Sequence, residues 1–410
     1  QHIRYIYDEK DHLTAINNGV NSPTVQGFDT QNRLETAIDA DSNPVHIAYN
    51  PQNLVTRVTD ERGLATDYSH DGFGELQTLI SPDTGTLSYD YDAAGNRTKQ
   101  TDARGVITTY AFDALNRLKM VTYPDQTKNM TYSYDNWQFC NTCNGRLAAL
   151  KDSSGQAVYI YAALGRMNMR YNNVTLPGVA AARLVTDFDF NKAGRLEQIT
   201  FPNGPAVNYG FDAAGQVDTV TYQTQDPNNA LLTVDKDLVT HLEYQPFGPI
   251  KGATYGNFRQ LNRTYDLDGR LDTQIVTAIQ SLDYEYDRLN NVEVIENLID
   301  NSRNEYFTYD NLNRLDTAAG KYGDIDYDYD EVGHREKRTI VRDDIIMVED
   351  YQIDSSSHRL DLIDINDGMS ATTREFEYDA AGNITLEKQG GATHMKPHYD
   401  DTNRMDSVSP

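Results

Sequence analysis

Two cysteines, Cys140 and Cys143, are the residues with the clearest capacity for covalent or metal chemistry. Two residues separate them, a spacing that also occurs in zinc sites and in redox pairs. A zinc site needs four ligands, and the sequence holds no second cysteine pair. A redox pair is expected in βαβ surroundings, which are absent here. We therefore interpret Cys140 and Cys143 as a candidate disulfide that staples an enlarged loop, and the sequence leaves their redox state open.

Carboxylates alternate with tyrosines at Asp326, Asp328 and Asp330, as they do in calcium-binding loops. The glycine and the terminal glutamate of such a loop are missing. In a strand the three carboxylates would line one face, which predicts a solvated surface, with weak cation binding as the alternative. His394 and His398 are four residues apart, but Pro397 between them opposes a helix that would align them. The sequence thus predicts no catalytic residue, no metal site and no cofactor.

All of these residues lie inside a repeat whose fullest copy is Tyr91-Asp92-Ala93-Ala94-Gly95-Asn96-Arg97. The common form is aromatic-Asp-x-x-(Gly or Asn)-(Asn or Arg)-(Arg or Leu). Repeats of about 21 residues, about 18 of them in this chain, are typical of arrays in which each unit packs on its neighbours. The lead positions are Tyr7, Phe28, Tyr49, His70, Tyr91, Phe112, Tyr134, Tyr161, Phe190, Phe211, Tyr244, Tyr265, Tyr286, Tyr309, Tyr329, Tyr351, Tyr378 and Tyr399.

Each copy predicts a β-hairpin. Aromatic residues two apart before the aspartate, as in Tyr89 and Tyr91, share one face of a strand. The aspartate can accept backbone N–H groups and start a turn. Four residues after the lead aromatic stands a glycine or asparagine in most copies, the residue types that tolerate positive φ. Alternation then resumes, as in Arg117-Leu118-Lys119-Met120-Val121, and a wider return such as Phe201-Pro202-Asn203-Gly204 leads to the next copy.

The residues expected to matter are therefore structural members of the repeat. They are Tyr7, Phe28, Tyr91, Asp92, Gly95, Phe112, Asp113, Asn116, Phe211, Asp212, Gly215, Tyr265, Asp266, Gly269, Tyr309, Asp310, Asn313, Tyr378, Asp379 and Gly382. No segment shows a sustained helical period, so the predicted fold class is all-β. We expect one continuous array over residues 1–410, cut from a larger protein, with insertions near 136–145, 172–185, 223–240 and 354–373. If a partner site exists, these insertions are where we expect it.

Composition narrows the function classes. The net charge is -26, which opposes binding to nucleic acid or to an anionic membrane surface. No run of about 18 apolar residues occurs, so no membrane span is predicted. Hydrophobic residues make up only 38%, but 28 tyrosines argue against disorder and predict a sheet whose apolar side is largely tyrosine. The acidic residues indicate a solvated face, with an acidic inner wall for a basic cargo as the alternative.

The repeated Tyr-Asp-x-x-Gly-Asn-Arg, with links such as Pro202-Asn203-Gly204 before Phe211-Asp212, resembles the YD or RHS repeat. That family includes the C components of insecticidal Tc toxins, bacterial polymorphic toxins and the teneurin adhesion proteins. The resemblance implies a strip of antiparallel β-hairpins that spirals into a hollow shell or barrel. In the toxins the shell encloses a C-terminal toxic domain, and the members are secreted or lie at the cell surface.

One departure limits what can be carried over from the toxins. Their shells end in Asp-Pro-x-Gly motifs used for self-cleavage, and Asp226-Pro227-Asn228-Asn229 lacks the glycine. We therefore expect a non-catalytic shell segment whose partner is a C-terminal effector domain or another shell subunit. The alternatives are an extracellular adhesion or glycan-binding scaffold with a cell-surface glycan or protein as its partner, and, less favoured, a carbohydrate-active enzyme.

Overall fold

The computed structural model describes residues 3–135, 142–162, 164–175, 178, 180–226, 229–246 and 248–410, with the backbone alone for residues 229–232. The chain forms two compact units. Unit 1 consists of residues 1–109, 284–296 and 300–410, and unit 2 of residues 110–283 and 297–299. The repeat runs through both units, so each unit is built from the same kind of hairpin.

The described residues form 36 strands. The first eleven are β1 (Arg4–Tyr7), β2 (Leu13–Asn17), β3 (Thr24–Phe28), β4 (Leu34–Ile38), β5 (Pro44–Tyr49), β6 (Val55–Thr59), β7 (Ala65–His70), β8 (Leu76–Ser81), β9 (Gly85–Tyr91), β10 (Arg97–Thr101) and β11 (Ile107–Phe112). The next fourteen are β12 (Leu118–Thr122), β13 (Met130–Tyr134), β14 (Leu147–Asp152), β15 (Gly155–Tyr161), β16 (Met167–Val174), β17 (Ala182–Phe190), β18 (Leu196–Thr200), β19 (Ala206–Phe211), β20 (Val217–Asp226), β21 (Asn229–Tyr244), β22 (Ile250–Tyr255), β23 (Gln260–Tyr265), β24 (Leu271–Val276) and β25 (Gln280–Tyr286). The last eleven are β26 (Val292–Asn297), β27 (Glu305–Tyr309), β28 (Leu315–Gly320), β29 (Gly323–Tyr329), β30 (Arg335–Arg342), β31 (Ile345–Ile353), β32 (Leu360–Asn366), β33 (Ala371–Tyr378), β34 (Ile384–Gln389), β35 (Ala392–Tyr399) and β36 (Met405–Ser409).

Helical structure in the described residues is confined to two short 3-10 turns, Gln126–Lys128 and Asn301–Arg303. Asp125 and Asp300 cap them by accepting the backbone N–H of Thr127 and Ser302. Within the described part of the chain, no helix has the length and apolar character needed to cross a membrane.

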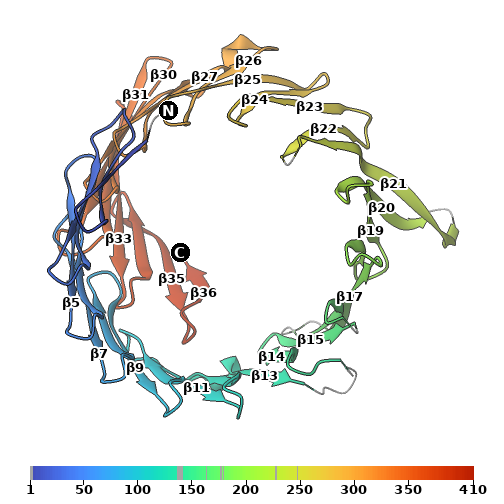
Figure 1. Ribbon diagram of the computed structural model, residues 1–410, viewed down its shortest axis with the longest axis horizontal. Helices are drawn as coiled ribbons and strands as arrows, with labels where there is room; N and C mark the ends of the chain where they lie inside the picture. The colour runs from blue at the N-terminus through green and yellow to red at the C-terminus, as the bar shows by residue number, and fades with distance from the viewer. Residues whose placement is uncertain are drawn as a thin grey trace. The chain divides into compact units, whose positions relative to one another are not determined.

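Strands that follow one another in sequence pair antiparallel, as in unit 2 from β12 to β25, which Figure 1 shows in chain order from green to yellow. The register shifts at the lead aromatic of most copies, whereas in the copy led by Tyr351 it shifts between Gln352 and Ile353. In the β27–β28 hairpin Thr308 pairs with Thr317, whereas Tyr309 pairs with Leu315. One extra residue on the second strand is a β-bulge, which bends and twists the hairpin. The repeat therefore places its lead ring at a bulge beside the turn.

Burial alternates along the strands and is shallow. Strand β29 is a clear case, because Ile325, Tyr327 and Tyr329 are half-buried while the residues between them are exposed. A densely buried cluster occurs in unit 2, where Ala149, Val158 and Tyr171 pack together on β14, β15 and β16. Alternation of this kind is expected of an antiparallel sheet with one packed face and one solvated face. Polar contacts at the turns must therefore determine much of how the strands are arranged.

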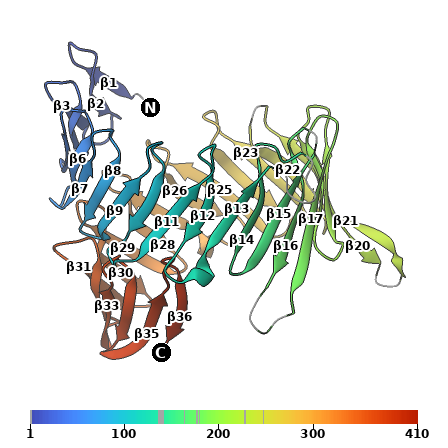
Figure 2. The same cartoon turned by 90° about the horizontal axis from the view of Figure 1, so that it is seen from below.

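In unit 1 the early strands lie beside strands from the far end of the sequence. Figure 2 shows the early strands, in blue, above the late strands, in orange and red, and turns of the two groups are hydrogen-bonded to each other. Hydrogen bonds join these two stretches; one example is from the side chain of Arg62 to the carbonyl oxygen of Ser357, at 2.9 Å. Unit 1 thus has a boundary between early and late repeats, which the local repeat pattern does not specify.

Candidate functional site: the repeated turn and the unit 1 seam

The turn that follows the lead aromatic is held by its aspartate, as at Asp113. The backbone N–H of Asp113 donates to Arg117 O at 2.9 Å, and that of Asn116 donates to Asp113 O at 3.0 Å. The carboxylate Oδ1 of Asp113 accepts the backbone N–H groups of Leu115 at 2.8 Å and of Arg117 at 3.0 Å. Its Oδ2 accepts the guanidinium Nε of Arg117 at 2.7 Å. The aspartate therefore satisfies the turn amides that no strand can reach.

These donors stabilise the charged carboxylate. The backbone N–H of Arg117 lowers the pKa of Asp113 below its ordinary value, against the opposing effect of burial, and the guanidinium adds to the lowering. The same order of causes lowers the pKa of Asp29, where Arg33 is the donor. Hydrogen bonds to the ionised form always act in this direction. The turns are therefore built around ionised aspartate.

The residue four positions after the lead aromatic adopts positive φ at most of the predicted positions. Examples are Asn116 at 59°, Asn313 at 62°, Gly95 at 78° and Gly382 at 87°. At such φ a side chain with a Cβ is strained, and asparagine and glycine are the least affected. Gly248 is an exception, because its φ lies outside this region.

In several copies an arginine connects the turn to the next repeat. Arg117 Nη1 and Nη2 donate to the two oxygens of Asp135, at 3.1 and 2.7 Å, and its guanidinium carbon lies 4.4 Å from the centre of the Tyr134 ring. This side chain lowers the pKa of Asp135 to about 2, with help from the backbone N–H of Gly145. The guanidinium-over-ring distance is 4.6 to 5.7 Å in the equivalent pairs. These are Arg33 with Tyr49, Arg146 with Tyr161, Arg166 with Phe190, Arg195 with Phe211, Arg314 with Tyr329 and Arg359 with Tyr378.

The lead tyrosine connects the repeats in the opposite direction through its hydroxyl. Tyr329 Oη donates to the carbonyl oxygen of Leu315, the first strand residue after the preceding turn, at 2.8 Å. Burial raises the pKa of this phenol above its ordinary value. Distances of 2.7 to 2.9 Å recur elsewhere. The pairs are Tyr49 with Leu34, Tyr91 with Leu76, Tyr161 with Leu147, Tyr244 with Val217, Tyr265 with Ile250, Tyr309 with Val292 and Tyr378 with Leu360.

The sequence-predicted site residues therefore occupy one recurring arrangement, spread along the sheet and not gathered in a cleft. The lead aromatics end a strand, the aspartates accept the turn amides, and the glycines and asparagines take the left-handed positions. Tyr7 is exposed, with 57% of its surface accessible, because β1 has a strand partner on one side only among the described residues. Whether these residues are required for function stays a prediction.

Cys143 is fully buried with Ala148 in a small cluster against Tyr161. Its Sγ lies 3.6 Å from the carbonyl oxygen of Tyr159. Cys140 lies outside the described residues, as does most of the insertion near 136–145, so the candidate disulfide stays a prediction.

We expected Asp326, Asp328 and Asp330 to line one solvated face, and this expectation is wrong for Asp330. Asp326 and Asp328 are exposed on β29, opposite the half-buried Tyr327, as expected for a solvated face. Asp330 is buried, with 8% of its surface accessible, because it is the capping residue of the next turn. Its two oxygens accept the backbone N–H and contact the ring Nδ1 of His334, at 2.7 and 2.8 Å. The strand alternation ends where the turn begins.

His394 and His398 both lie on β35, so no helix aligns them. His398 Nδ1 lies 2.7 Å from Asp406 Oδ1 on β36, and its side chain is largely exposed. Among the described residues, no group of three or more His, Cys, Asp or Glu side chains has the arrangement of a metal site.

A second feature of unit 1, which we call the unit 1 seam, joins return turns of the early repeats to the repeat turns between residues 310 and 404. The contacting residues are 268 to 298 positions apart in sequence. The hydrogen-bonded pairs are Asn21 with Asn311, Asp41 with Asn311, Arg62 with Asp354 and Ser357, Asp83 with His358 and Arg359, and Arg104 with Asp400. Residues 354–359, at the start of the insertion expected near 354–373, thus contact early repeats within unit 1.

The centre of the seam is His358, which lies between two carboxylates from early repeats. Its Nε2 is 2.8 Å from Asp60 Oδ2, and its Nδ1 is 2.9 Å from Asp83 Oδ2. The ring centre of His334 lies 5.0 Å away. Arg62 Nε lies 3.7 Å from Asp330 Oδ2, the carboxylate oxygen that also contacts His334 Nδ1.

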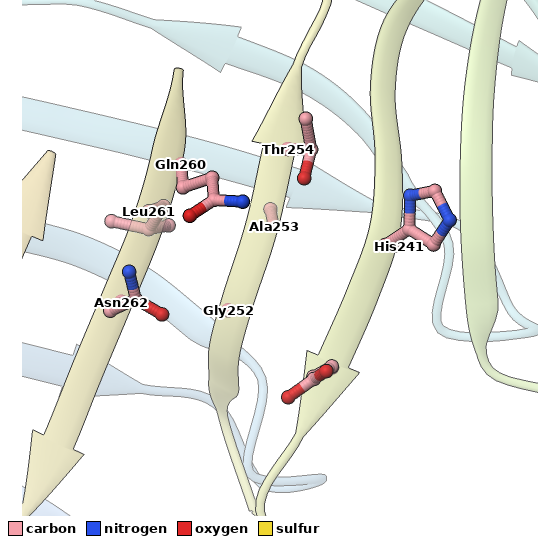
Figure 3. A pocket seen from close by; sticks show the side chains of 8 residues that line it. His241, Gly252, Ala253, Thr254, Gln260, Leu261 and Asn262 are labelled. Atoms are coloured by element: carbon pink, nitrogen blue, oxygen red, sulfur yellow. The ribbon is translucent and has the colours of Figure 1, made fainter. Parts of the chain in front are cut away.

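Unit 2 has a polar hollow of about 390 Å³ on β21, β22 and β23. Figure 3 shows His241 on one strand, Thr254 and Gly252 on the next, and Gln260 and Asn262 on the third. His241 has φ 52° and lies at a bulge, because Thr240 pairs with Thr254 and Glu243 with Gly252. The hollow therefore follows from a register shift, and its lining offers hydrogen bonds but no bonded acid–base pair.

Sequence reasoning missed three kinds of residue. The arginine that covers the next lead ring recurs in the motif, so its regular position was a usable signal. The return turns also carry aspartate caps, as at Asp60 and Asp102, which accept the backbone N–H of Leu64 and Val106 at 2.8 and 2.9 Å. His358 gave no signal, since its partners are far away in sequence.

Comparison with known proteins agrees with this arrangement. The family described as RHS Repeat matches residues 49–86 and 91–128, which hold complete hairpins with lead Tyr49 and Tyr91. These two stretches are therefore RHS repeats. No curated protein matches the chain by sequence.

Solved structures share the fold of the whole chain. The crystal structure of TcdB2–TccC3–Cdc42 has a TM-score of 0.74 and 15% identity, covering 100% of this chain and 24% of that one. The Tc holotoxin pore of Photorhabdus luminescens gives the same values. TcdB2–TccC3 without its hypervariable C-terminal region has a TM-score of 0.72 and 15% identity, with 99% and 24% covered. The chain thus spans about a quarter of those proteins, and the predicted all-β fold of antiparallel hairpins is confirmed.

Proposed function

We propose that this chain is a non-catalytic wall segment of an RHS shell, which encloses a C-terminal toxin or effector domain for secretion and delivery. The observation that carries the proposal is the fold match over the whole chain to structures containing TccC3. One of those proteins is described as having a hypervariable C-terminal region. A variable segment behind a constant wall is what an interchangeable cargo requires.

The contacts of the repeat support a structural role. The aspartate stiffens each turn, the arginine holds the next aspartate and ring, and the tyrosine hydroxyl reaches back to the preceding repeat. Repeats that carry both residues are therefore bonded in both directions by charge-assisted or buried hydrogen bonds. A wall of this kind resists opening at any single repeat, because neighbouring repeats share their contacts.

The partners follow from the same proposal. The matched structures combine TccC3 with TcdB2, so we propose a second shell subunit as a partner of this chain, beside the cargo itself. The net charge of -26 favours a cargo with a basic surface, because an acidic wall attracts basic groups. The proposed location is extracellular, after secretion.

Protease protection tests the proposal on the natural polypeptide that contains this segment. In the intact protein, we expect a non-repeat fragment to survive treatment with proteinase K. The same fragment, prepared without the repeats, should be degraded at the same protease concentration. A variant that opens the seam, Arg62→Ala, should expose the fragment. Arg57→Ala, which removes the exposed pair with Asp67, should not. Electron cryo-microscopy of the same sample should show density enclosed by the repeats.

Other outcomes separate this function from the alternatives. Digestion of every non-repeat fragment at the same rate in wild type and Arg62→Ala would contradict enclosure. Saturable binding of the intact protein to a defined glycan, with no protected fragment, would favour the adhesion or glycan-binding role.

A further inference from the structure

His358 differs from the other described seam residues because both of its ring nitrogens face carboxylate oxygens. Nε2 lies 2.8 Å from Asp60 and Nδ1 lies 2.9 Å from Asp83. A carboxylate only accepts hydrogen bonds, and a neutral imidazole has a single N–H donor. In the neutral form one ring nitrogen would direct its lone pair at a carboxylate oxygen. Only the imidazolium form can donate from both ring nitrogens at once.

The surrounding charges favour the same form. Three carboxylates face the cluster, from Asp60, Asp83 and Asp330, and two guanidinium groups reach it, from Arg62 and Arg359. The guanidinium of Arg359 donates to the carbonyl oxygen of Asp83, with Nε at 3.0 Å. One imidazolium thus makes this set electrically neutral. Asp354 belongs to the same turn and adds a further negative charge, although its own carboxylate accepts from Ser356.

His334 is the other titratable ring in the cluster, and its surroundings differ. Its Nδ1 contacts Asp330 at 2.8 Å, which a single N–H satisfies. Its ring centre lies 5.0 Å from that of His358, so two positive rings would repel each other. The geometry therefore assigns the extra proton to His358.

We propose that His358 is a proton-operated clasp of the unit 1 seam. With both ring nitrogens protonated it holds Asp60 and Asp83 against the late repeats, and loss of one proton loosens the seam. Deprotonation of the docked ring would leave one ring nitrogen with no hydrogen to donate to its carboxylate, so we expect docking to weaken as the pH rises. This inference concerns contacts within unit 1 and stands whether or not the wall encloses a cargo.

Asp83 sets the acid limit of the clasp. Burial raises the pKa of Asp83, but the hydrogen bonds from the ring and backbone of His358 outweigh burial and hold that pKa below its ordinary value. A carboxylate of this kind contributes while it is ionised and stops contributing when acid protonates it. The clasp is therefore expected to hold at mildly acidic pH and to weaken above and below that range.

Hydrogen–deuterium exchange of the full chain tests the clasp. The readout is the protection of backbone amides in residues 81–85 and 354–359, corrected for the intrinsic pH dependence of exchange. Between about pH 5 and about pH 8, where imidazole titrates, we expect seam protection to fall about tenfold. His358→Gln should lower protection at the acidic end and abolish its pH dependence. His398→Gln removes a histidine–aspartate pair outside the seam and should leave the pH dependence intact.

Asp60→Asn provides a second variant that preserves the shape of the seam. An asparagine amide can accept from a protonated ring nitrogen or donate to a neutral one. The seam should therefore stay protected while its pH dependence shrinks. The proposal is overturned if wild-type seam protection is independent of pH, or if the pH dependence survives unchanged in both His358→Gln and Asp60→Asn.

Discussion

Two turns with nearly the same sequence differ in what surrounds them. In unit 2, Asp113-Ala114-Leu115-Asn116-Arg117 leaves Leu115 71% exposed. In unit 1, Asp310-Asn311-Leu312-Asn313-Arg314 leaves Leu312 only half-exposed, because early repeats contact this turn. Asn311 Nδ2 donates to Asp41 at 2.9 Å, and the carbonyl oxygen of Asn311 accepts from Asn21 at 2.6 Å.

Inside the two turns the geometry is the same. The aspartate Oδ2 accepts its arginine Nε at 2.7 Å in unit 2 and 2.6 Å in unit 1. The asparagine φ values are 59° and 62°. The comparison teaches that local sequence determines the turn, whereas distant repeats determine what the turn binds. The predictions below separate these two contributions.

Acid should lower the stability of the fold the most, because it protonates the aspartate carboxylates that hold the turns. Hydrogen bonds, largely from backbone N–H groups, hold the pKa of Asp29, Asp71 and Asp113 below the ordinary value. Groups with a lowered folded-state pKa stabilise the fold above the unfolded pKa, and that contribution is lost as the pH falls through the folded values. We expect the unfolding temperature to fall by more than about 10 °C between about pH 5 and about pH 2, followed by circular dichroism.

The control for acid sensitivity is a carboxylate outside any turn. Asp326→Asn, on the exposed face of β29, should leave the acid profile unchanged, whereas Asp113→Asn should flatten it slightly. An unfolding temperature that is constant across this pH range would mean that ionised aspartates do not hold the turns.

Replacing one glycine by alanine in each unit should separate backbone strain from seam contact. Gly269 in unit 2 has φ 81°, and nothing lies within 4 Å of an added Cβ. Gly382 in unit 1 has φ 87°, and an added Cβ would lie 2.7 Å from the carbonyl oxygen of Asp83. We expect Gly269→Ala to cost about 1 kcal/mol from left-handed strain and Gly382→Ala about 3 kcal/mol in free energy of unfolding. Equal losses in chemical denaturation would show that the seam adds nothing at this position.

Arg62→Ala should disrupt the seam without changing any repeat turn. Arg62 donates to the carbonyl oxygens of Ser357 and Asp354 at 2.9 and 3.1 Å, and its side chain is largely buried. Loss of these charged donors should lower the free energy of unfolding by about 2 kcal/mol. Arg57→Ala removes an exposed arginine whose partner is Asp67, so it should have little effect. If urea unfolding gives the same free energy for Arg62→Ala and Arg57→Ala, the seam contacts of Arg62 do not stabilise the fold.

The sequence predicts what the repeat contains and little of what lies between distant repeats. Alternating aromatics predict the strands, and the aspartate with a glycine or asparagine predicts the turn, because these depend on neighbours in sequence. Asp330 shows the limit, since its burial follows from its place in a turn and from Arg62, far away in the chain. Gly248 shows another, because its spacing fits the pattern and its backbone does not. His358 could not be found from sequence, since its partners come from early repeats.

The smallest effect should come from the lead ring, where both tyrosine and phenylalanine occur. Tyr329→Phe removes the hydrogen bond to the carbonyl oxygen of Leu315 and keeps the ring under Arg314, 4.8 Å away. We expect a loss of about 1 kcal/mol in free energy of unfolding, the usual contribution of one such bond. The reciprocal change is Phe211→Tyr in unit 2, where Arg195 covers the ring at 5.5 Å. Its new hydroxyl should reach the carbonyl oxygen of Leu196, the residue equivalent to Leu315, and recover part of that amount. If Tyr329→Phe is neutral and Phe211→Tyr destabilises, the hydroxyl does not join neighbouring repeats, and the arginine alone connects them.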